Sequence, residues 1–204
     1  MEPFSRLCAV AVPLDDANID TGRIFPSRFL RKPRAAGYHN FLFRDERFDE
    51  AGVERADFIM NRPPYRNARI VVAGANFACG SSREPAVYAF VDAGFRCIIA
   101  PGFGDIFFSN CFRNGLLPVV LPAAEVLELR RQLHDRPGAE FAVDLDAQTV
   151  EGADGRRRRF EIDAARKLRL SKGLDDAALA LEYLADIERF EHRYLAEWPW
   201  AAAK

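Results

Sequence analysis

The chain has 204 residues, of which 49% are hydrophobic, and this composition is sufficient to form the core of a single domain. Its 29 basic and 30 acidic residues give a formal net charge of −1, so no overall field attracts the chain to nucleic acid or to an anionic membrane. The sequence has neither a signal-peptide pattern nor an apolar run of roughly 18 residues, so we expect a cytoplasmic protein without a membrane span.

The cysteines and histidines are too scattered to predict a metal site. The four cysteines form no C-x-x-C pair, and no histidine has a second ligand at a useful spacing. This pattern argues against zinc or an iron–sulfur cluster held by this chain alone, and it favours buried free thiols at Cys8, Cys79, Cys97 and Cys111.

The first half of the chain predicts an α/β core. Residues 5–12 form an apolar run that predicts a buried strand ending at Pro13, and a long irregular segment follows. Three further strands are predicted in ARIVVAG, FRCIIAPGF and LLPVVLP, with helices in VYAFVDAGF and GDIFFSNCFRNG between them. Because strands and helices alternate, the strands are expected to be parallel, with right-handed crossovers.

The second half predicts elements added to this core. Residues 123–138 form an amphipathic pattern typical of a helix, and residues 140–162 predict an antiparallel hairpin that turns at Gly152 to Gly155. The tail from Asp163 is predicted to be helical.

A basic run, RRRRF at residues 156–160, raises the question of nucleic-acid binding. Acidic residues flank it, so we interpret it as a solvated strand of the hairpin. We expect one domain over residues 1–204, with a core at about 5–122 and the hairpin and helical tail at about 123–204.

The stretch NFACGSSREPAVYAF connects a predicted strand to a predicted helix, where open α/β sheets bind ligands. It matches neither the G-x-x-x-x-G-K-[ST] phosphate loop nor the G-x-S-x-G nucleophile elbow. Pro85 disfavours helical geometry in the residue before it. The helix is therefore expected to begin near Pro85, with Ser81, Ser82 and Arg83 on the preceding turn.

Two interpretations of this turn remain open from its local chemistry. Free amides at a helix start favour an anion, Arg83 can clamp a carboxylate, and Ser81 or Ser82 can accept a proton beside it. Alternatively, Ser81 and Glu84 form a capping box and Arg83 pairs with a surface carboxylate.

A resemblance to a known family indicates more about the fold and function than this local chemistry does. NFACGSSREPAVYAFVDAGFRCIIAPGFGDIFFSNCFRNGLLPV resembles the signature of the aconitase swivelling domain, and VPLDDANIDTGRIFPSRFL and GLDDAALALEYLADIERFE resemble the two ends of the small subunits of bacterial 3-isopropylmalate dehydratases. The resemblance covers nearly the whole chain. It implies an aconitase-type swivelling β/β/α domain with a parallel-sheet core, an added antiparallel hairpin and C-terminal helices.

The resemblance also implies a function. It indicates a hydro-lyase of leucine biosynthesis that isomerises 2- and 3-isopropylmalate, a small dicarboxylate, by dehydration and rehydration. Such a chain is active only with a large subunit, and the 4Fe-4S cluster is expected on that partner, with no cofactor or metal bound by this chain. Carried over by position, the catalytic base is Ser81 and the substrate-binding residues are Arg83, Ser82, Asp20 and Thr21.

The chain departs from the family pattern at two positions. Pro85 replaces a His after Ser-Ser-Arg-Glu, and Gly22 replaces the second Asp of Asp-Thr-Asp. The loop from about Ser27 to Phe43 corresponds to the substrate-selecting region of the family. A paralogous dehydratase for citramalate or a dimethylmalate, and a non-catalytic regulatory module, therefore stay open as alternatives. A stand-alone serine hydrolase is disfavoured, because no histidine is placed as its base.

Overall fold

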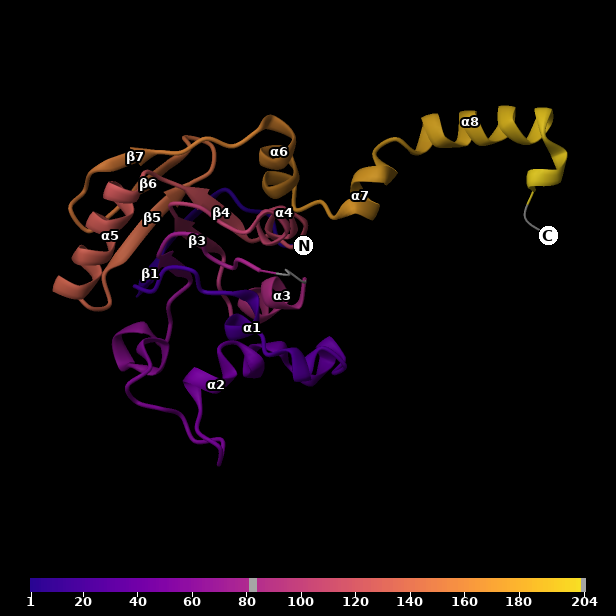
Figure 1. The fold of residues 1–204 in the computed structure, drawn as a ribbon. Helices are drawn as coiled ribbons and strands as arrows, with labels where there is room; N and C mark the ends of the chain where they lie inside the picture. The colour runs from indigo at the N-terminus through magenta and orange to yellow at the C-terminus, as the bar shows by residue number, and fades with distance from the viewer. Residues whose placement is uncertain (81–83, 203–204) are drawn as a thin grey trace.

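The computed structural model describes residues 1–80 and 84–202. Within these residues seven strands form one sheet in the order β4-β3-β2-β1-β5-β6-β7 (Figure 1). The predicted α/β class with a parallel core is confirmed. The parallel part contains β1 (Arg6–Leu14), β2 (Ile70–Ala73), β3 (Cys97–Ala100) and β4 (Leu117–Val120). The antiparallel part contains β5 (Glu140–Asp144), β6 (Thr149–Glu151) and β7 (Arg157–Arg159).

Strand β1 joins the two parts because it changes partner along its length. Its first residues, Arg6 to Val10, pair antiparallel with β5, and Ala11 to Leu14 pair parallel with β2. The strand continues through Pro13, so the predicted end at this proline is wrong. The pairing with β5 has already ended at Val10, and the missing N–H of Pro13 therefore removes no bond from that ladder.

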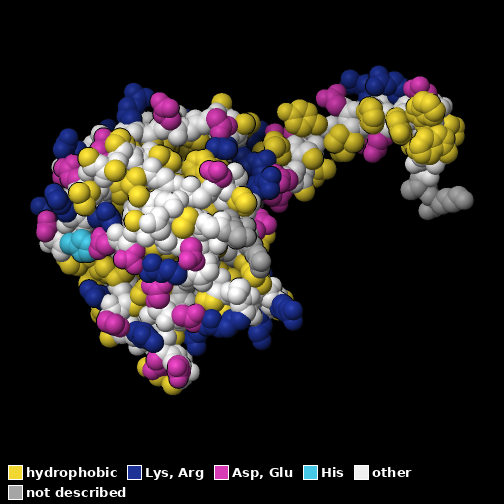
Figure 2. Space-filling view, viewed as in Figure 1, with side chains coloured by type: hydrophobic (Ala, Val, Ile, Leu, Met, Phe, Trp, Pro, Cys, Tyr) yellow, Lys and Arg dark blue, Asp and Glu magenta, His cyan; other side chains and the backbone are white. Residues whose placement is uncertain are grey.

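The two faces of the sheet bury separate hydrophobic clusters. In β2, Val71 and Ala73 face the cluster that includes helix α3 (Pro85–Asp92), while Ile70 and Val72 face the cluster that includes α5 (Ala123–Asp135). This alternation follows from the two-residue period of a strand. Helix α4 (Asp105–Arg113) contributes to both clusters. On the body surface seen in Figure 2, basic and acidic side chains are intermingled, as the balanced composition predicts.

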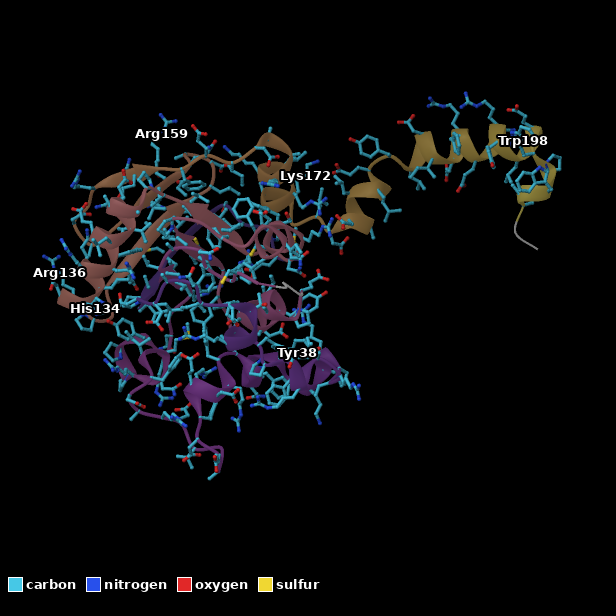
Figure 3. The ribbon with its side chains drawn as sticks, in the orientation of Figure 1. Tyr38, His134, Arg136, Arg159, Lys172 and Trp198 are labelled. Atoms are coloured by element: carbon cyan, nitrogen blue, oxygen red, sulfur yellow. The ribbon has the colours of Figure 1, made fainter. Side chains whose placement is uncertain are left out.

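The segment between β1 and β2, predicted to be irregular, folds into short helical turns. It contains α1 (Thr21–Ile24), α2 (Arg44–Arg47) and five 3₁₀ turns between residues 27 and 65. Pro26 and Pro33 are the N-cap residues of two of these turns, and Pro63 is the first residue of a third, where its fixed φ suits a helical position. Aromatic rings pack them together: Phe25 lies 4.7 Å from Tyr38 (Figure 3), and Phe29 stacks on Phe41 at 4.3 Å, measured between ring centroids.

The region after α5 contains two hairpins, where one was predicted. The turn at Gly152 to Gly155 is confirmed, with the Gly155 amide donating to the Gly152 carbonyl at 3.1 Å. A second turn separates β5 from β6. There the Asp144 carboxylate accepts the Ala147 amide at 2.8 Å, and Gln148 adopts a φ of 54°. The pattern DLDAQ contained this turn signal, but the apolar alternation around it concealed the break.

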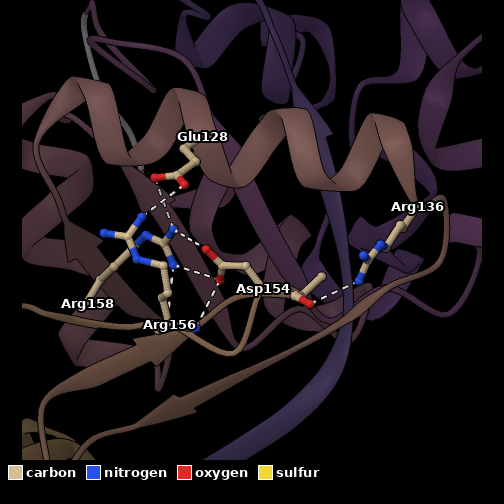
Figure 4. A network of polar contacts seen from close by, with 6 residues as sticks. Glu128, Arg136, Asp154, Arg156 and Arg158 are labelled. Atoms are coloured by element: carbon tan, nitrogen blue, oxygen red, sulfur yellow. Dashed lines mark hydrogen bonds and ion pairs between the residues drawn. The ribbon is translucent and has the colours of Figure 1, made fainter.

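The basic run lies on β7 and the turn before it, but it is not wholly solvated as predicted. Arg158 is only 6% exposed, and its guanidinium contacts Asp154 at 2.9 Å and Glu128 of α5 at 3.2 Å (Figure 4). Arg156 also contacts Glu128, at 3.2 Å. The run therefore attaches the hairpin to α5. Its neighbour Arg159 is exposed.

The predicted helical tail is confirmed. Helix α6 (Ala164–Lys172) buries Leu170 against the body, whereas α7 (Asp176–Leu181) and α8 (Leu184–Glu197) contain no buried residue. These last helices extend away from the body (Figure 1). Among the described residues, no helix is long and apolar enough to cross a membrane.

We expect Arg158→Ala to lower the free energy of unfolding by about 1–3 kcal/mol, because Asp154 and Glu128 lose charge-assisted hydrogen bonds. Arg159→Ala is the matched control on the same strand, and it should leave the free energy of unfolding nearly unchanged. Urea denaturation measures both. Equal losses in the two variants would contradict a structural role for the buried guanidinium.

The same contact predicts a pH dependence. The hydrogen bond from Arg158 lowers the pKa of Asp154 from 3.8 to about 2. The carboxylate therefore stabilises the fold above about pH 4, and this contribution is lost as the pH falls through 3.8 towards 2. Asp154→Asn should be less stable than wild type at neutral pH, and its unfolding free energy should fall less steeply over that acidic range. Parallel slopes in urea titrations would show that Asp154 is not the group responsible.

Candidate active site

The candidate site lies where the chain leaves β1 and β2 at their carboxyl ends. The Thr21 amide donates to the Cys79 carbonyl oxygen at 3.1 Å, and Asp20 forms an isolated parallel bridge with Cys79. Because β1 and β2 are parallel neighbours, segments far apart in the sequence meet at one edge of the sheet. The structure thus brings the predicted Asp20 and Thr21 beside Gly80, the residue before the predicted serine turn.

Ser81, Ser82 and Arg83, the predicted base and two predicted substrate-binding residues, lie outside the described residues.

Helix α3 begins at Pro85, as predicted. The preceding Glu84 accepts a hydrogen bond from the side chain of Asn114 at 2.9 Å, which links the start of α3 to the end of α4. The capping box between Ser81 and Glu84 stays a prediction.

A cavity of about 360 Å³ opens between α1, α3 and the loop after β2. The polar part of its wall includes Asp20 and Thr21, and the apolar part includes Phe25, Leu30 and Ala86. Both departures from the family pattern also line it. The full lining consists of Asp20, Thr21, Gly22, Phe25, Ser27, Leu30, Gly80, Pro85 and Ala86.

The charge of this wall limits what it can bind alone. Asp20 is exposed, and one of its carboxylate oxygens accepts the Arg23 amide at 2.9 Å as the N-cap of α1. No Lys or Arg belongs to the described lining. Within the described part of the chain, the cavity therefore offers acceptors, the two hydroxyls of Thr21 and Ser27, and apolar surface. A positive charge for an anionic ligand must come from elsewhere.

Ion pairs fix α1 against the segments around it. Arg23 donates to Glu46 of α2 at 2.9 Å and to Asp16 at 2.8 Å. The hydrogen bond that Arg23 donates to Glu46, followed by the one that it donates to Asp16, raises the pKa of Arg23. The guanidinium thus remains charged and holds the α1 turn that presents Asp20 and Thr21. Sequence reasoning missed this contact, because nothing in the local pattern around Arg23 indicates a partner in α2.

The loop after β2 is shaped by close backbone contacts. The Phe77 amide donates to the Gly102 carbonyl, and the Gly104 amide donates to the Phe77 carbonyl, both at 2.9 Å. Ala78 is fully buried with a φ of 56°, a left-handed conformation that costs an alanine on the order of 1 kcal/mol. A Cβ atom on Gly104 would lie 2.4 Å from the Ala78 carbonyl oxygen. Glycine is therefore required there for the loop to reach the cavity.

The apolar lining was only partly predicted. Ser27 and Leu30 belong to the expected substrate-selecting loop, but Phe25 and Ala86 were not singled out. Both are buried. Phe25 lies just before the expected substrate-selecting loop, and Ala86 follows Pro85 after the predicted serine turn. Their apolar character resembles that of ordinary core residues, so no sequence signal distinguishes them.

The described residues contain no group of three or more His, Cys, Asp or Glu side chains placed to hold a metal ion. Cys97 and Cys111 are fully buried, and burial raises the pKa of both thiols. The predicted burial is wrong for the other two thiols: Cys8 is exposed on β1, and Cys79, next to Gly80 at the cavity, is only partly buried.

Comparison with known proteins places this chain in a family. The aconitase C-terminal domain model matches residues 1–124, and the LeuD_N model matches residues 128–164. The chain is 46% identical to the 3-isopropylmalate dehydratase small subunit of Dinoroseobacter shibae, over 98% of this chain and all of that protein. It is 49% identical to the one from Phenylobacterium zucineum, over 98% of each chain. The chain belongs to the 3-isopropylmalate dehydratase small-subunit family.

A solved structure shows the same fold. The 3-isopropylmalate dehydratase (leuD) of Methanocaldococcus jannaschii superposes with a TM-score of 0.63, covering 93% of this chain and 99% of that chain, at 22% sequence identity. The small-subunit fold predicted from the resemblance is thus confirmed.

Gly104→Ala should distort the loop after β2, because the added methyl group meets the backbone oxygen of Ala78. We expect a loss of about 1–3 kcal/mol in the free energy of unfolding, and altered amide NMR shifts at Cys79 and Gly80. Gly102→Ala is the control, since nothing lies within 4 Å of its Cβ position. Equal stability of the two variants, with unchanged shifts at Cys79 and Gly80, would contradict a steric clash between residue 104 and Ala78.

Proposed function

We propose that this chain is the small subunit of a 3-isopropylmalate dehydratase, a hydro-lyase that interconverts 2- and 3-isopropylmalate in leucine biosynthesis. The observation that carries the proposal is the high identity, over nearly the whole chain, to proteins that bear this name. Because these relatives are called small subunits, we infer a large-subunit partner. The biosynthetic role favours the cytoplasm.

We place the 4Fe-4S cluster on the large subunit, because the thiols of this chain do not fit such a group. A cluster requires several thiolates, but Cys97 and Cys111 are buried with raised pKa values, Cys8 is on β1 away from the cavity lining, and Cys79 alone lies next to the cavity residue Gly80. On the partner, the cluster would supply a Lewis acid for the substrate hydroxyl and a carboxylate. The residues of this chain would then position the substrate and move its proton.

The cavity can orient an alkyl-substituted malate. Phe25, Leu30 and Ala86 offer an apolar surface for the isopropyl group, while Asp20 and Thr21 can bond the polar end of the substrate. Since the described lining has no basic residue, we assign a substrate carboxylate to Arg83, with Ser82 beside it. Ser81 is the proposed base.

The proposed isomerisation needs no co-substrate, oxidant or reductant, because the elements of water that are removed are added back. Dehydration removes a proton from one carbon and hydroxide from its neighbour, and rehydration returns them to exchanged positions. The base must therefore release the proton that it has taken up. A serine hydroxyl next to a clamped carboxylate can do this when its surroundings stabilise the alkoxide.

The function is tested by mixing the chain with the large subunit of 3-isopropylmalate dehydratase from the same organism under anaerobic conditions. The pair should convert 3-isopropylmalate with a higher kcat/KM than citramalate or dimethylmalate. Gly22 and Pro85 both line the cavity, so this comparison also tests whether those residues change substrate preference. A preference for citramalate would assign a paralogous function, and an inactive complex would favour the regulatory module.

In the active pair, Ser81→Ala should lower kcat by about 10²- to 10⁴-fold with little change in KM, because a general base acts mainly in the transition state. Arg83→Lys should instead raise KM, since lysine keeps the charge but loses the planar fork. Both variants should still fold and bind the large subunit. Near-normal turnover of Ser81→Ala would move the base elsewhere, and an equal loss of folding in both variants would favour the capping-box interpretation.

A further inference from the structure

The C-terminal arm, residues 176–202, has an unusual exposure. Every residue from 181 to 200 is exposed, although this segment contains α8 and the following 3₁₀ turn (Pro199–Ala201). The exposed side chains include Phe190 at 53% and Trp200 at 76%. Figures 1 and 3 show the arm, with Trp198 near its end, projecting from the body.

The base of the arm is attached to the body by ion pairs. Asp176 of α7 contacts Arg169 of α6 and lies 3.6 Å from Arg113 of α4. Lys172 contacts Glu182 at 2.7 Å. These contacts lie before α8, so the arm is anchored at one end and presents α8 to the surroundings.

The exposed apolar side chains of α8 share one face. They recur at spacings of three and four residues, as on one side of an α-helix. The rings of Phe190 and Tyr194 stack with their centroids 5.6 Å apart. In Figure 2 the hydrophobic side chains follow the lower side of the arm, and basic side chains occupy the upper side. This apolar stripe consists of Leu184, Ile187, Phe190, Tyr194, Leu195 and Trp198.

Such a helix requires a partner to be stable. An isolated helix of 14 residues is marginal in water, and α8 gains no stability from burial against the body. A continuous exposed stripe with several aromatic residues is typical of a protein interface, where Tyr, Phe and Trp supply much of the binding free energy.

Charge distinguishes between the possible partners. Helix α8 carries four acidic residues, Asp186, Glu188, Glu191 and Glu197, and two basic ones, Arg189 and Arg193, which gives a net charge of 2 − 4 = −2 with His192 neutral. Helices that lie on anionic membranes carry an excess of Lys and Arg on their polar face. A membrane surface is therefore disfavoured.

The position of Glu191 disfavours a second copy of this chain. Leu184 and Trp198 each lie seven residues from Glu191, close to two helical turns, so Glu191 lies within the apolar stripe. In a symmetric antiparallel pair centred on this stripe, Glu191 would face its own copy, and the two like charges would repel each other. A different protein with a basic side chain at that point has no such penalty.

We propose that the apolar stripe docks into an apolar groove of the large subunit, in which a basic side chain faces Glu191. This inference rests on the proposed function, which supplies the large subunit as partner. The matches to the small-subunit relatives extend over 98% of this chain and therefore run into the arm. The arm thus belongs to the part of the chain shared with proteins that are named as subunits.

The test compares variants of the full chain in titration calorimetry with the large subunit. Phe190→Ala and Trp198→Ala should each weaken binding by roughly 30-fold, the effect of truncating a central interface residue. Glu191→Arg should weaken binding to the large subunit by at least as much, and Glu191→Gln should make the binding affinity less dependent on salt concentration. Arg189→Ala, on the opposite face, should bind as wild type. At saturating large subunit, kcat should be unchanged in all the stripe variants.

The outcomes separate this inference from the proposed function. An inactive wild-type pair contradicts the proposed function, whereas an active pair whose affinity is unaffected by the stripe variants contradicts only the docking role of the arm. A wild-type homodimer in light scattering that dissociates on Phe190→Ala would assign the stripe to self-association. Binding of the wild-type chain to phosphatidylserine vesicles, lost in the same variant, would assign it to a membrane. Either result overturns the proposal.

Discussion

The change of partner along β1 is the constraint on which the site depends. Because residues 11–14 pair parallel with β2, the chain leaves both strands at the same edge of the sheet, and Thr21 can bond Cys79. The earlier part of the strand pairs with β5 and attaches the antiparallel hairpins to the same core. One strand therefore serves both parts of the sheet. A shift of its register by one residue would move its apolar side chains to the wrong face and separate the two loops that meet at the cavity.

The sequence predicts the regular core well and the cavity poorly, for a physical reason. Buried parallel strands such as Ile70–Ala73, which Gly74 follows, are short apolar runs, and their signal is local. The loop geometry depends instead on long-range backbone contacts such as that between Gly104 and Ala78, which leave no pattern beyond a glycine. Arg158 illustrates the same limit. The residues next to Arg158 in the sequence indicated a solvated strand, but its burial depends on a contact with Glu128 of helix α5.

The site residues were predicted from the family resemblance more than from local chemistry. The Ser-Ser-Arg turn fits either an anion site or a helix cap, and these alternatives require different partners for the same atoms. Asp20 and Thr21 have no local feature that marks them, and only their family position singled them out. The structure adds that Gly22 and Pro85 line the cavity with them. Both departures from the family pattern therefore lie where they can alter the fit of the substrate without disturbing the core.

The cavity and the arm place different demands on an interface. A substrate cavity must open to exchange ligand, so the surface around it cannot be held permanently against a partner. The arm separates these functions, because the apolar stripe of α8 lies beyond α7 and contributes nothing to the cavity lining. A contact made there would keep the two subunits at a high effective concentration while leaving the cavity face uncovered. The ion pairs of Asp176 with Arg113 and Arg169 hold the start of the arm against the body.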